Sequence, residues 1–253
     1  MRLTRRALLA GAPLLAAAGK LPLAAVPIDR LSTRWWRERH EQKLAELRHG
    51  PVELIFLGDS ITQNWEKTGP EAWANFQPSW RQFYGDRHAV NLGFSGDATS
   101  HLLWRIEHGE LDGIAPKAAV ILIGANNLGN VHWSASDTVV GIVTVVAETR
   151  RRLPRTKLLL LAVLPSDRSA WATAATLEIN RALAARFSHD AGLSYMDLAP
   201  LFLRNGVVDP GQFYDPLQQP PAAPLHPTAQ AQARMAAAIE PTLARLLNDR
   251  NHG

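Results

Sequence analysis

A serine stands directly after the first apolar run of the chain. The run Val-Glu-Leu-Ile-Phe-Leu (52–57) leads into Gly58, Asp59 and Ser60. This sequence can be an ordinary turn that ends a strand, or it can hold the Ser60 hydroxyl at the edge of a sheet as a nucleophile. A serine becomes nucleophilic when a base, usually a histidine oriented by a third group, takes its proton. The residue types at this turn leave both interpretations open.

The candidate base is His226, one of nine histidines in the chain. It stands on the loop that enters the last apolar-periodic segment, whereas most of the other histidines fall in or beside predicted helices. His88 and His132 lie near loop or strand starts and remain alternatives by position alone. A capping or surface role for His226 also stays open.

Donors for a developing oxyanion are also present. Backbone N–H groups beside a glycine and the amide of an asparagine can stabilise such a charge. Gly96 follows the second apolar run and Asn126 follows the third. A helix after Ser60 would add the positive end of its dipole. Each of these residues, taken alone, is compatible with a turn.

The pattern of elements explains how these residues could meet. Short apolar runs that suit buried parallel strands alternate with segments of helical periodicity. The runs cover residues 52–57, 88–93, 118–124, 157–164 and 193–198, and the helical segments cover 33–50, 99–111, 134–153, 174–192 and 228–247. Ser134 and Thr228 are predicted N-caps, and Gly192 a helix stop. This alternation predicts a flavodoxin-like three-layer α/β/α sandwich with about five parallel strands in a single domain, residues 27–253. In such a sheet, ligands bind at the carboxyl ends of the strands.

Four blocks carry a resemblance to a known family. They are "GDS" with Ser60, "GFSGDATS" with Gly96, "GANN" with Asn126 and "LHPT" with His226. In this order and spacing the chain resembles the SGNH (GDSL-type) hydrolases, and most of all the catalytic subunits of intracellular platelet-activating-factor acetylhydrolase. The resemblance implies a nucleophile at Ser60, a base at His226, and an oxyanion hole formed by the Ser60 and Gly96 N–H groups and the Asn126 amide. It implies no metal and no organic cofactor, and it makes Asp59 part of the turn.

The chain departs from the family at the acid of the triad. The family places an aspartate three residues before the histidine, where this chain has Ala223. The nearest acid in a matching context is Asp215, separated from His226 by a proline-rich insert, residues 218–225. A looped-out insert could return His226 to Asp215, because loop length costs little entropy. We therefore predict Asp215 as the orienting acid, with Asp209 or a backbone carbonyl as alternatives.

The resemblance favours an esterase that removes short acyl groups, most simply acetyl, from a small-molecule or carbohydrate ester, through an acyl-enzyme on Ser60. The alternatives are a lysophospholipase or thioesterase for longer acyl chains, and a catalytically silent carbohydrate- or lipid-binding module. Trp65 and Trp104, near the blocks, are either core residues or a platform for a sugar ring. A homodimer is conceivable, because the resembled subunits pair.

Composition limits the chemistry, the partners and the cellular location to be expected. The chain has no cysteine, which excludes disulfides and thiolate chemistry. Four of the 27 basic residues lie within the first 26 residues, where no acid occurs, and the other basic residues equal the 23 acidic ones in number. No nucleic-acid partner is therefore expected. Residues 1–26, with Arg5-Arg6 before an apolar stretch, resemble a twin-arginine export signal. They predict a periplasmic or secreted protein with no stable membrane span after processing.

Overall fold

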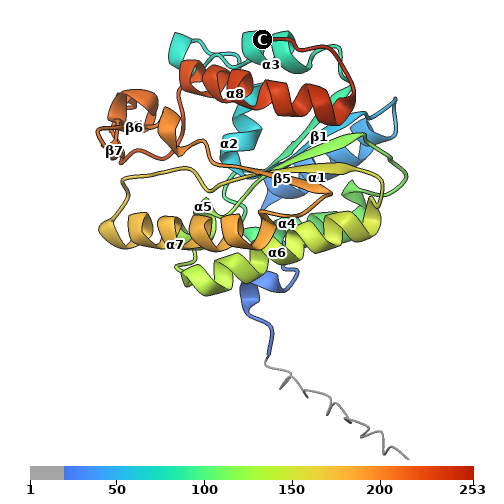
Figure 1. Ribbon diagram of the computed structural model, residues 1–253, viewed down its shortest axis with the longest axis horizontal. Coiled ribbons are helices and arrows are strands. Elements are labelled where there is room, and N and C mark those ends of the chain that lie inside the picture. Colours follow the sequence, from blue (N-terminus) through green and yellow to red (C-terminus); the bar gives the residue numbers. More distant parts are fainter. Residues whose placement is uncertain (1–19) are drawn as a thin grey trace, which may run out of the picture.

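A parallel sheet forms the centre of the protein. The computed structural model describes residues 20–253, so most of the predicted export signal, residues 1–19, lies outside the described residues. The strands are β1 (Leu54–Gly58), β2 (Ala89–Gly93), β3 (Ala118–Leu122), β4 (Lys157–Leu161) and β5 (Leu193–Met196). They pair in parallel in the order β2-β1-β3-β4-β5 (Figure 1). This is the flavodoxin-like order, and all five predicted strands are confirmed.

Helices cover both faces of this sheet (Figure 1). One face packs against α1 (Arg34–Leu47), α4 (Thr99–Arg105), α6 (Ala135–Arg152) and α7 (Ala170–Phe187), and the other against α3 (Gln77–Tyr84) and α8 (Ala229–Leu247). The side chains of β1 alternate accordingly. Ile55 and Leu57 enter the first apolar core, and Phe56 enters the second. The predicted three-layer sandwich is therefore confirmed.

Several short elements escaped the sequence pattern. The helices α2 (Ser60–Gln63) and α5 (Ala125–Gly129) follow directly on β1 and β3, and a small antiparallel hairpin joins β6 (Leu203–Arg204) to β7 (Val207–Val208). The predicted helix 99–111 is α4 followed by a wider helical turn, Ile106–Glu110. Single turns of 3₁₀ helix cover Leu23–Ala25, Asn64–Glu66, Ala72–Ala74, Ala199–Leu201, Pro210–Gln212 and Asp215–Leu217.

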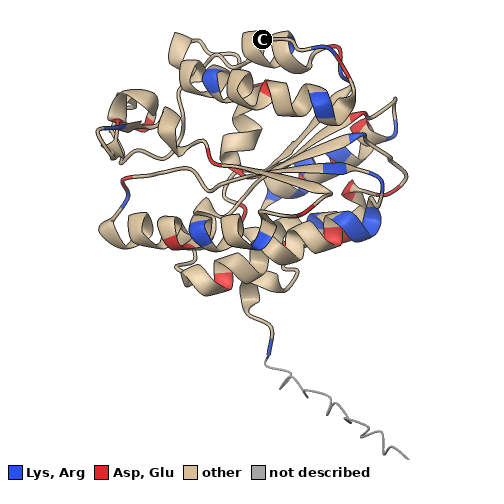
Figure 2. Cartoon of the chain, viewed as in Figure 1, with Lys and Arg blue, Asp and Glu red and all other residues tan. Residues whose placement is uncertain are grey.

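The predicted helix ends are partly right. The Ser134 side chain accepts a hydrogen bond from the Asp137 N–H at 3.0 Å, and Thr228 accepts one from Ala231 at 3.1 Å, so both N-caps are confirmed. The helix stop predicted at Gly192 is wrong, because α7 already ends at Phe187. Three arginines, 150–152, occupy the last turn of α6, where cations complement the helix dipole (Figure 2).

The segment just before residue 27 packs against the domain. The turn Leu23–Ala25 contacts α4 and α6, and the side chain of Ala24 is fully buried. Its carbonyl accepts a hydrogen bond of 2.6 Å from the Thr99 hydroxyl. None of the helices within residues 20–253 combines the length and the apolarity needed to cross a membrane.

Candidate active site

Ser60 lies at the centre of the sheet's carboxyl edge. It is the first residue of α2, and the side chain of Asp59 caps that helix by accepting from the Ile61 N–H at 3.0 Å. The Ser60 Oγ lies 2.9 Å from Nε2 of His226, a contact between residues 166 positions apart. Strand β1 stands between β2 and β3, where the sheet order reverses and where ligands bind in this fold. Of the candidate bases, the structure therefore brings His226 to Ser60, not His88 or His132.

The carboxylate of Asp215 holds the other side of the imidazole. Its Oδ1 lies 2.8 Å from His226 Nδ1, and its Oδ2 accepts hydrogen bonds from the N–H groups of Leu225 and His226. Burial alone would raise the pKa of this carboxyl, but the hydrogen bonds from His226 and Leu225 outweigh burial and lower the pKa below its usual value. Asp215 is therefore ionised at neutral pH and orients the ring.

The proline-rich insert leaves and returns at this same carboxylate. The Ala222 N–H donates to the Asp215 carbonyl at 2.9 Å, and the Tyr214 N–H donates to the His226 carbonyl at 2.9 Å. Residues 218–225 thus form a loop that closes on Asp215. The alternative acid, Asp209, instead accepts from the Gly211 N–H at 3.1 Å and from Arg204.

Gly96 and Asn126 follow the two strands that neighbour β1 in the sheet. Gly96 follows β2 with a φ of +78°, a conformation that favours glycine. Asn126 follows β3, and its Nδ2 donates to the Asp97 carbonyl at 3.0 Å while its Oδ1 accepts from Asn130. These bonds fix which amide atom is the donor, and they leave one N–H of Nδ2 free for another acceptor.

A buried network that the sequence analysis missed supports the Gly96 loop. The side chain of Asp97 is fully buried and accepts hydrogen bonds from Arg30, Trp36 and Arg105 at 3.0, 2.8 and 2.8 Å. Arg30 also donates to the Ser95 carbonyl at 2.8 Å. The aspartate directly after Gly96 was the available signal, but two of its donors, Arg30 and Trp36, lie in distant segments.

The carboxyl of Asp59 is the other titratable group beside the nucleophile. Its side chain is 1% exposed, and this burial raises its pKa to about 6, against the opposing effects of the Ile61 N–H and His226. Asp59 makes no hydrogen bond to His226, so its position agrees with a role in the turn.

Of the two interpretations of Trp65 and Trp104, the structure favours packing over a sugar platform. Trp65 is 4% exposed in the core, and Trp104 stacks on His108 at 3.8 Å between ring centroids, so neither offers a free platform for a sugar. Tyr214, in contrast, stacks on the imidazole of His226 at 5.2 Å with nearly parallel rings.

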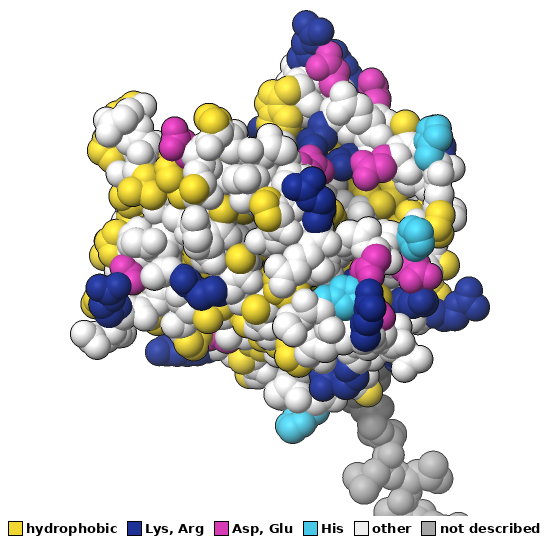
Figure 3. Space-filling view, turned by 90° about the horizontal axis from the view of Figure 1, so that it is seen from above, with side chains coloured by type: hydrophobic (Ala, Val, Ile, Leu, Met, Phe, Trp, Pro, Cys, Tyr) yellow, Lys and Arg dark blue, Asp and Glu magenta, His cyan; other side chains and the backbone are white. Residues whose placement is uncertain are grey.

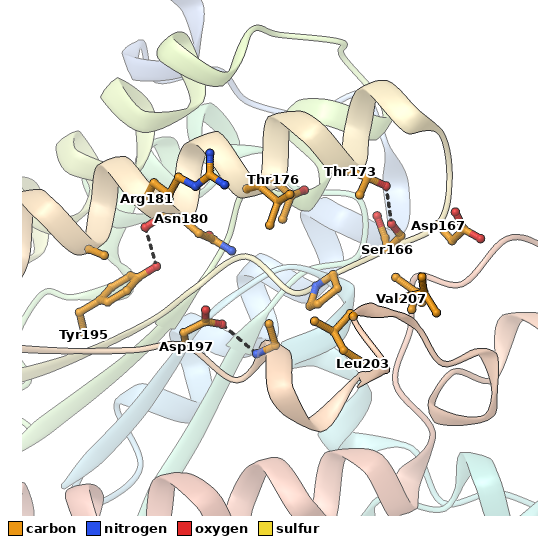
Figure 4. A pocket seen from close by; sticks show the side chains of 16 residues that line it. Ser166, Asp167, Thr173, Thr176, Asn180, Arg181, Tyr195, Asp197, Leu203 and Val207 are labelled. Carbon is orange, nitrogen blue, oxygen red and sulfur yellow. Dashed lines mark hydrogen bonds between the residues drawn. The ribbon is translucent and has the colours of Figure 1, made fainter.

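Two hollows lie beside segments that contact the cluster, one at the loop after β4 and the other at Tyr214. One, of about 590 Å³, runs between α7 and the β6–β7 hairpin, and Figure 4 shows Ser166 and Asp167 at one end of it. The hydrophobic residues around it include Leu177, Leu203 and Val207, and hydrophobic side chains also gather at the left of Figure 3, the end of the molecule that carries the hairpin in Figure 1. The other hollow, of about 660 Å³, is lined by Lys67, Glu71, Trp73, Ala74, Tyr214, Leu217, Gln218 and Gln219.

An aspartate, a histidine and a serine in hydrogen-bonded series on a flavodoxin-like sheet are typical of serine hydrolases. A sequence model of the GDSL-like lipase/acylhydrolase family matches residues 56–234. The chain belongs to this family, and the predicted class, a carboxylic ester hydrolase, is confirmed at the level of the family.

Individual relatives agree with this assignment. The chain is 33% identical over 130 residues to the human platelet-activating factor acetylhydrolase IB subunit alpha1, a match that spans 51% of each chain, about half of the relative's length. A putative acylhydrolase from Bacteroides fragilis shares the fold at a TM-score of 0.64 and 18% identity, over 83% of this chain and 96% of that one. A carbohydrate acetylesterase from Sinorhizobium meliloti shares it at 0.55 and 15% identity, over 77% and 99%.

Proposed function

We propose that this protein is a serine esterase that hydrolyses short-chain, chiefly acetyl, esters through an acyl-enzyme on Ser60. The observation that carries the proposal is the hydrogen-bonded series from Asp215 through His226 to Ser60. Nδ1 of the imidazole donates to Asp215, so Nε2 is free to take the Ser60 proton as the hydroxyl attacks the ester carbonyl. His226 then protonates the departing alcohol. In the second half of the reaction, His226 activates the water that attacks the acyl-enzyme, which releases the acid and regenerates Ser60.

The tetrahedral oxyanion would be held by the N–H groups of Ser60 and Gly96 and by the free N–H of the Asn126 amide. Such preorganised donors contribute roughly 3–4 kcal/mol each in comparable sites. Asp97 supports this arrangement in two ways. Its buried carboxylate fixes the loop that carries Gly96, and its backbone carbonyl accepts from the Asn126 amide and orients it.

The relatives' names support the acetyl preference, since they include acetylhydrolases and a carbohydrate acetylesterase. The hollow of about 660 Å³ supports a carbohydrate alcohol group, because the rings of Trp73 and Tyr214 and the side-chain amides of Gln218 and Gln219 line it. Tyr214 connects this hollow to the site, since its ring stacks on His226. Rings and amides together are suited to a sugar. The twin-arginine-like segment supports export to the periplasm or beyond.

The decisive experiment compares the wild type with Ser60→Ala on p-nitrophenyl acetate. We expect the rate to fall at least 10³-fold, as is typical when a triad member is removed. Ser188→Ala, an exposed serine on the α7 side, is the matched control and should keep the wild-type rate. Acid quenching should trap an acetyl group on Ser60 of the wild type. Equal background rates in wild type and Ser60→Ala would overturn the proposal in favour of a silent binding module.

The hollow of about 590 Å³ between α7 and the β6–β7 hairpin, called here the α7 groove, favours a second candidate function, the hydrolysis of longer acyl esters. Its apolar lining could hold an alkyl chain, and its Pro165–Asp167 end belongs to the loop that follows β4. A panel of p-nitrophenyl esters separates the two candidates, because rates that rise from acetyl to octanoyl would support the second. Leu177→Asp should then reduce octanoyl hydrolysis selectively. Val140→Asp is its control, since Val140 is an exposed apolar residue of α6 (37% exposed) that lies outside both hollows.

A further inference from the structure

Arg168 lies between the two halves of the candidate site. Its Nη2 donates to the carbonyl of Ala125, the residue before Asn126, at 2.9 Å. The adjacent Asp167 N–H donates to the carbonyl of Pro224, two residues before His226, at 3.1 Å. The loop after β4 is therefore fastened both to the segment of the oxyanion donor and to the segment of the base.

The end of α5 leaves room for the guanidinium. Gly129 closes this helix, and a methyl group built on it would lie 1.6 Å from Nη1 of Arg168. Any larger residue at position 129 would force the guanidinium to move. The bare backbone of Gly129 thus lets Arg168 lie flat against α5.

Within the part of the chain that the structure describes, no ion pair balances the charge of Arg168. The deeply buried arginines Arg87 and Arg105 each pair with two carboxylates. Arg168 is half-buried, yet within residues 20–253 it bonds only to the carbonyl of Ala125 and, at 3.4 Å, to the hydroxyl of Ser166. Its Nη1 donors are unused by these bonds.

Two carboxylates of the candidate site act on the charge of Arg168. Burial lowers the pKa of the Arg168 guanidinium, and the carboxylates of Asp59 and Asp215 act on it in the opposite sense. An arginine remains protonated at neutral pH even so. These two carboxylates would repel a negatively charged ester from Ser60, and Arg168 is the cation placed to offset that repulsion.

We propose that Arg168 binds an anionic group, a carboxylate or a phosphate, on the ester substrate close to the scissile bond. The N–H groups of Nη1 and the second N–H of Nη2 are the donors left for such a group. This inference rests on the proposed esterase function and narrows its substrate to esters that carry a negative charge.

A matched pair of esters tests the proposal. 4-Acetoxybenzoate is anionic and its methyl ester is neutral, while the acetyl group is the same in both. We expect Arg168→Gln to lower the ratio of kcat/KM for the anionic ester to that for the neutral ester about tenfold or more, mainly through KM, corresponding to the ~1.4 kcal/mol of one charge-assisted contact. Arg186→Gln, an exposed arginine in the last turn of α7 that lines neither hollow, should leave the ratio unchanged. 4-Acetoxyphenyl phosphate shows whether phosphate is preferred to carboxylate.

Arg168→Lys, which keeps the charge, should restore part of the ratio and guards against a misfolded variant. Equal losses for both esters in Arg168→Gln would overturn the proposal and leave Arg168 as a support for Ala125. A binding measurement separates this failure from a failure of the esterase function. Calorimetric titration of 4-acetoxybenzoate into Ser60→Ala and into Ser60→Ala/Arg168→Gln needs no turnover. Weaker binding to the double variant supports the anion site, and equal binding rejects it.

Discussion

Asp215 fixes both the side chain and the backbone of His226. One carboxylate oxygen lies 2.8 Å from the ring Nδ1, and the other accepts from the His226 N–H. The ring orientation and the return of the insert thus depend on a single group. Because hydrogen bonding keeps this carboxyl ionised, it would also stabilise the imidazolium that the proposed mechanism forms as Ser60 loses its proton.

Asp215→Asn should lower kcat for p-nitrophenyl acetate by roughly 10²–10⁴-fold with little change in KM. The asparagine amide offers an N–H to Nδ1, which favours the ring tautomer that cannot accept the Ser60 proton. Steady-state kinetics measure the effect, and Asp209→Asn, six residues earlier, is the control that should retain activity. A kcat near that of the wild type for Asp215→Asn would show that the carboxylate does not assist the base.

The insert should be dispensable for turnover of a small ester. Deletion of residues 218–225 joins Leu217 to His226, which restores an aspartate three residues before the histidine and replaces Leu225 by another leucine. Loop length contributes only about 0.6 kcal/mol per doubling, so we expect kcat for p-nitrophenyl acetate within tenfold of the full chain. A fall to the level of Asp215→Asn would mean that the insert itself maintains the Asp215–His226 geometry.

The sequence pattern was sufficient for the sheet, because buried parallel strands are continuous apolar runs and each of the five runs is a strand. The same topology brings the ends of β1, β2 and β3 to one edge, so the positions of Ser60, Gly96 and Asn126 after successive apolar runs were enough to group them. Their catalytic roles stay predictions.

Contacts between distant segments could not be predicted in this way. The buried Asp97 accepts hydrogen bonds from Arg30 and Trp36, which lie 67 and 61 residues before it, and no periodicity connects these positions. The short α5 after β3 has too few residues to show a helical period. Arg168 likewise lies in a loop, and nothing in the sequence indicates that its side chain bonds to the carbonyl of Ala125.

The segment before residue 27 should contribute to stability. Ala24 and Ala25 are 0% and 4% exposed, and the Ala24 carbonyl accepts from Thr99. Two buried methyl groups and one hydrogen bond are worth about 2 kcal/mol. A chain that starts at residue 27 should therefore unfold roughly 5 °C below one that starts at residue 21. Calorimetry of the two proteins measures the difference, and equal melting temperatures would show that the contact of Leu23–Ala25 with α4 and α6 adds nothing.

Asp59 should make stability depend on pH in a defined sense. Its pKa rises from 3.8 to about 6 on folding, so the folded state holds a proton that the unfolded state releases between these values. The wild type therefore loses stability as pH rises from about 4 to 6, by up to roughly 3 kcal/mol. Asp59→Asn can still cap α2 but cannot ionise, because its side chain is an amide.

Urea unfolding should show the Asp59→Asn variant to be more stable than the wild type at pH 8, with the gain vanishing near pH 4. Asp29→Asn is the control, since exposed Asp29 makes the same two-residue contact, to the Leu31 N–H at 3.0 Å. A gain of equal size at both pH values would trace the effect to packing, because only ionisation of the buried carboxyl changes between them.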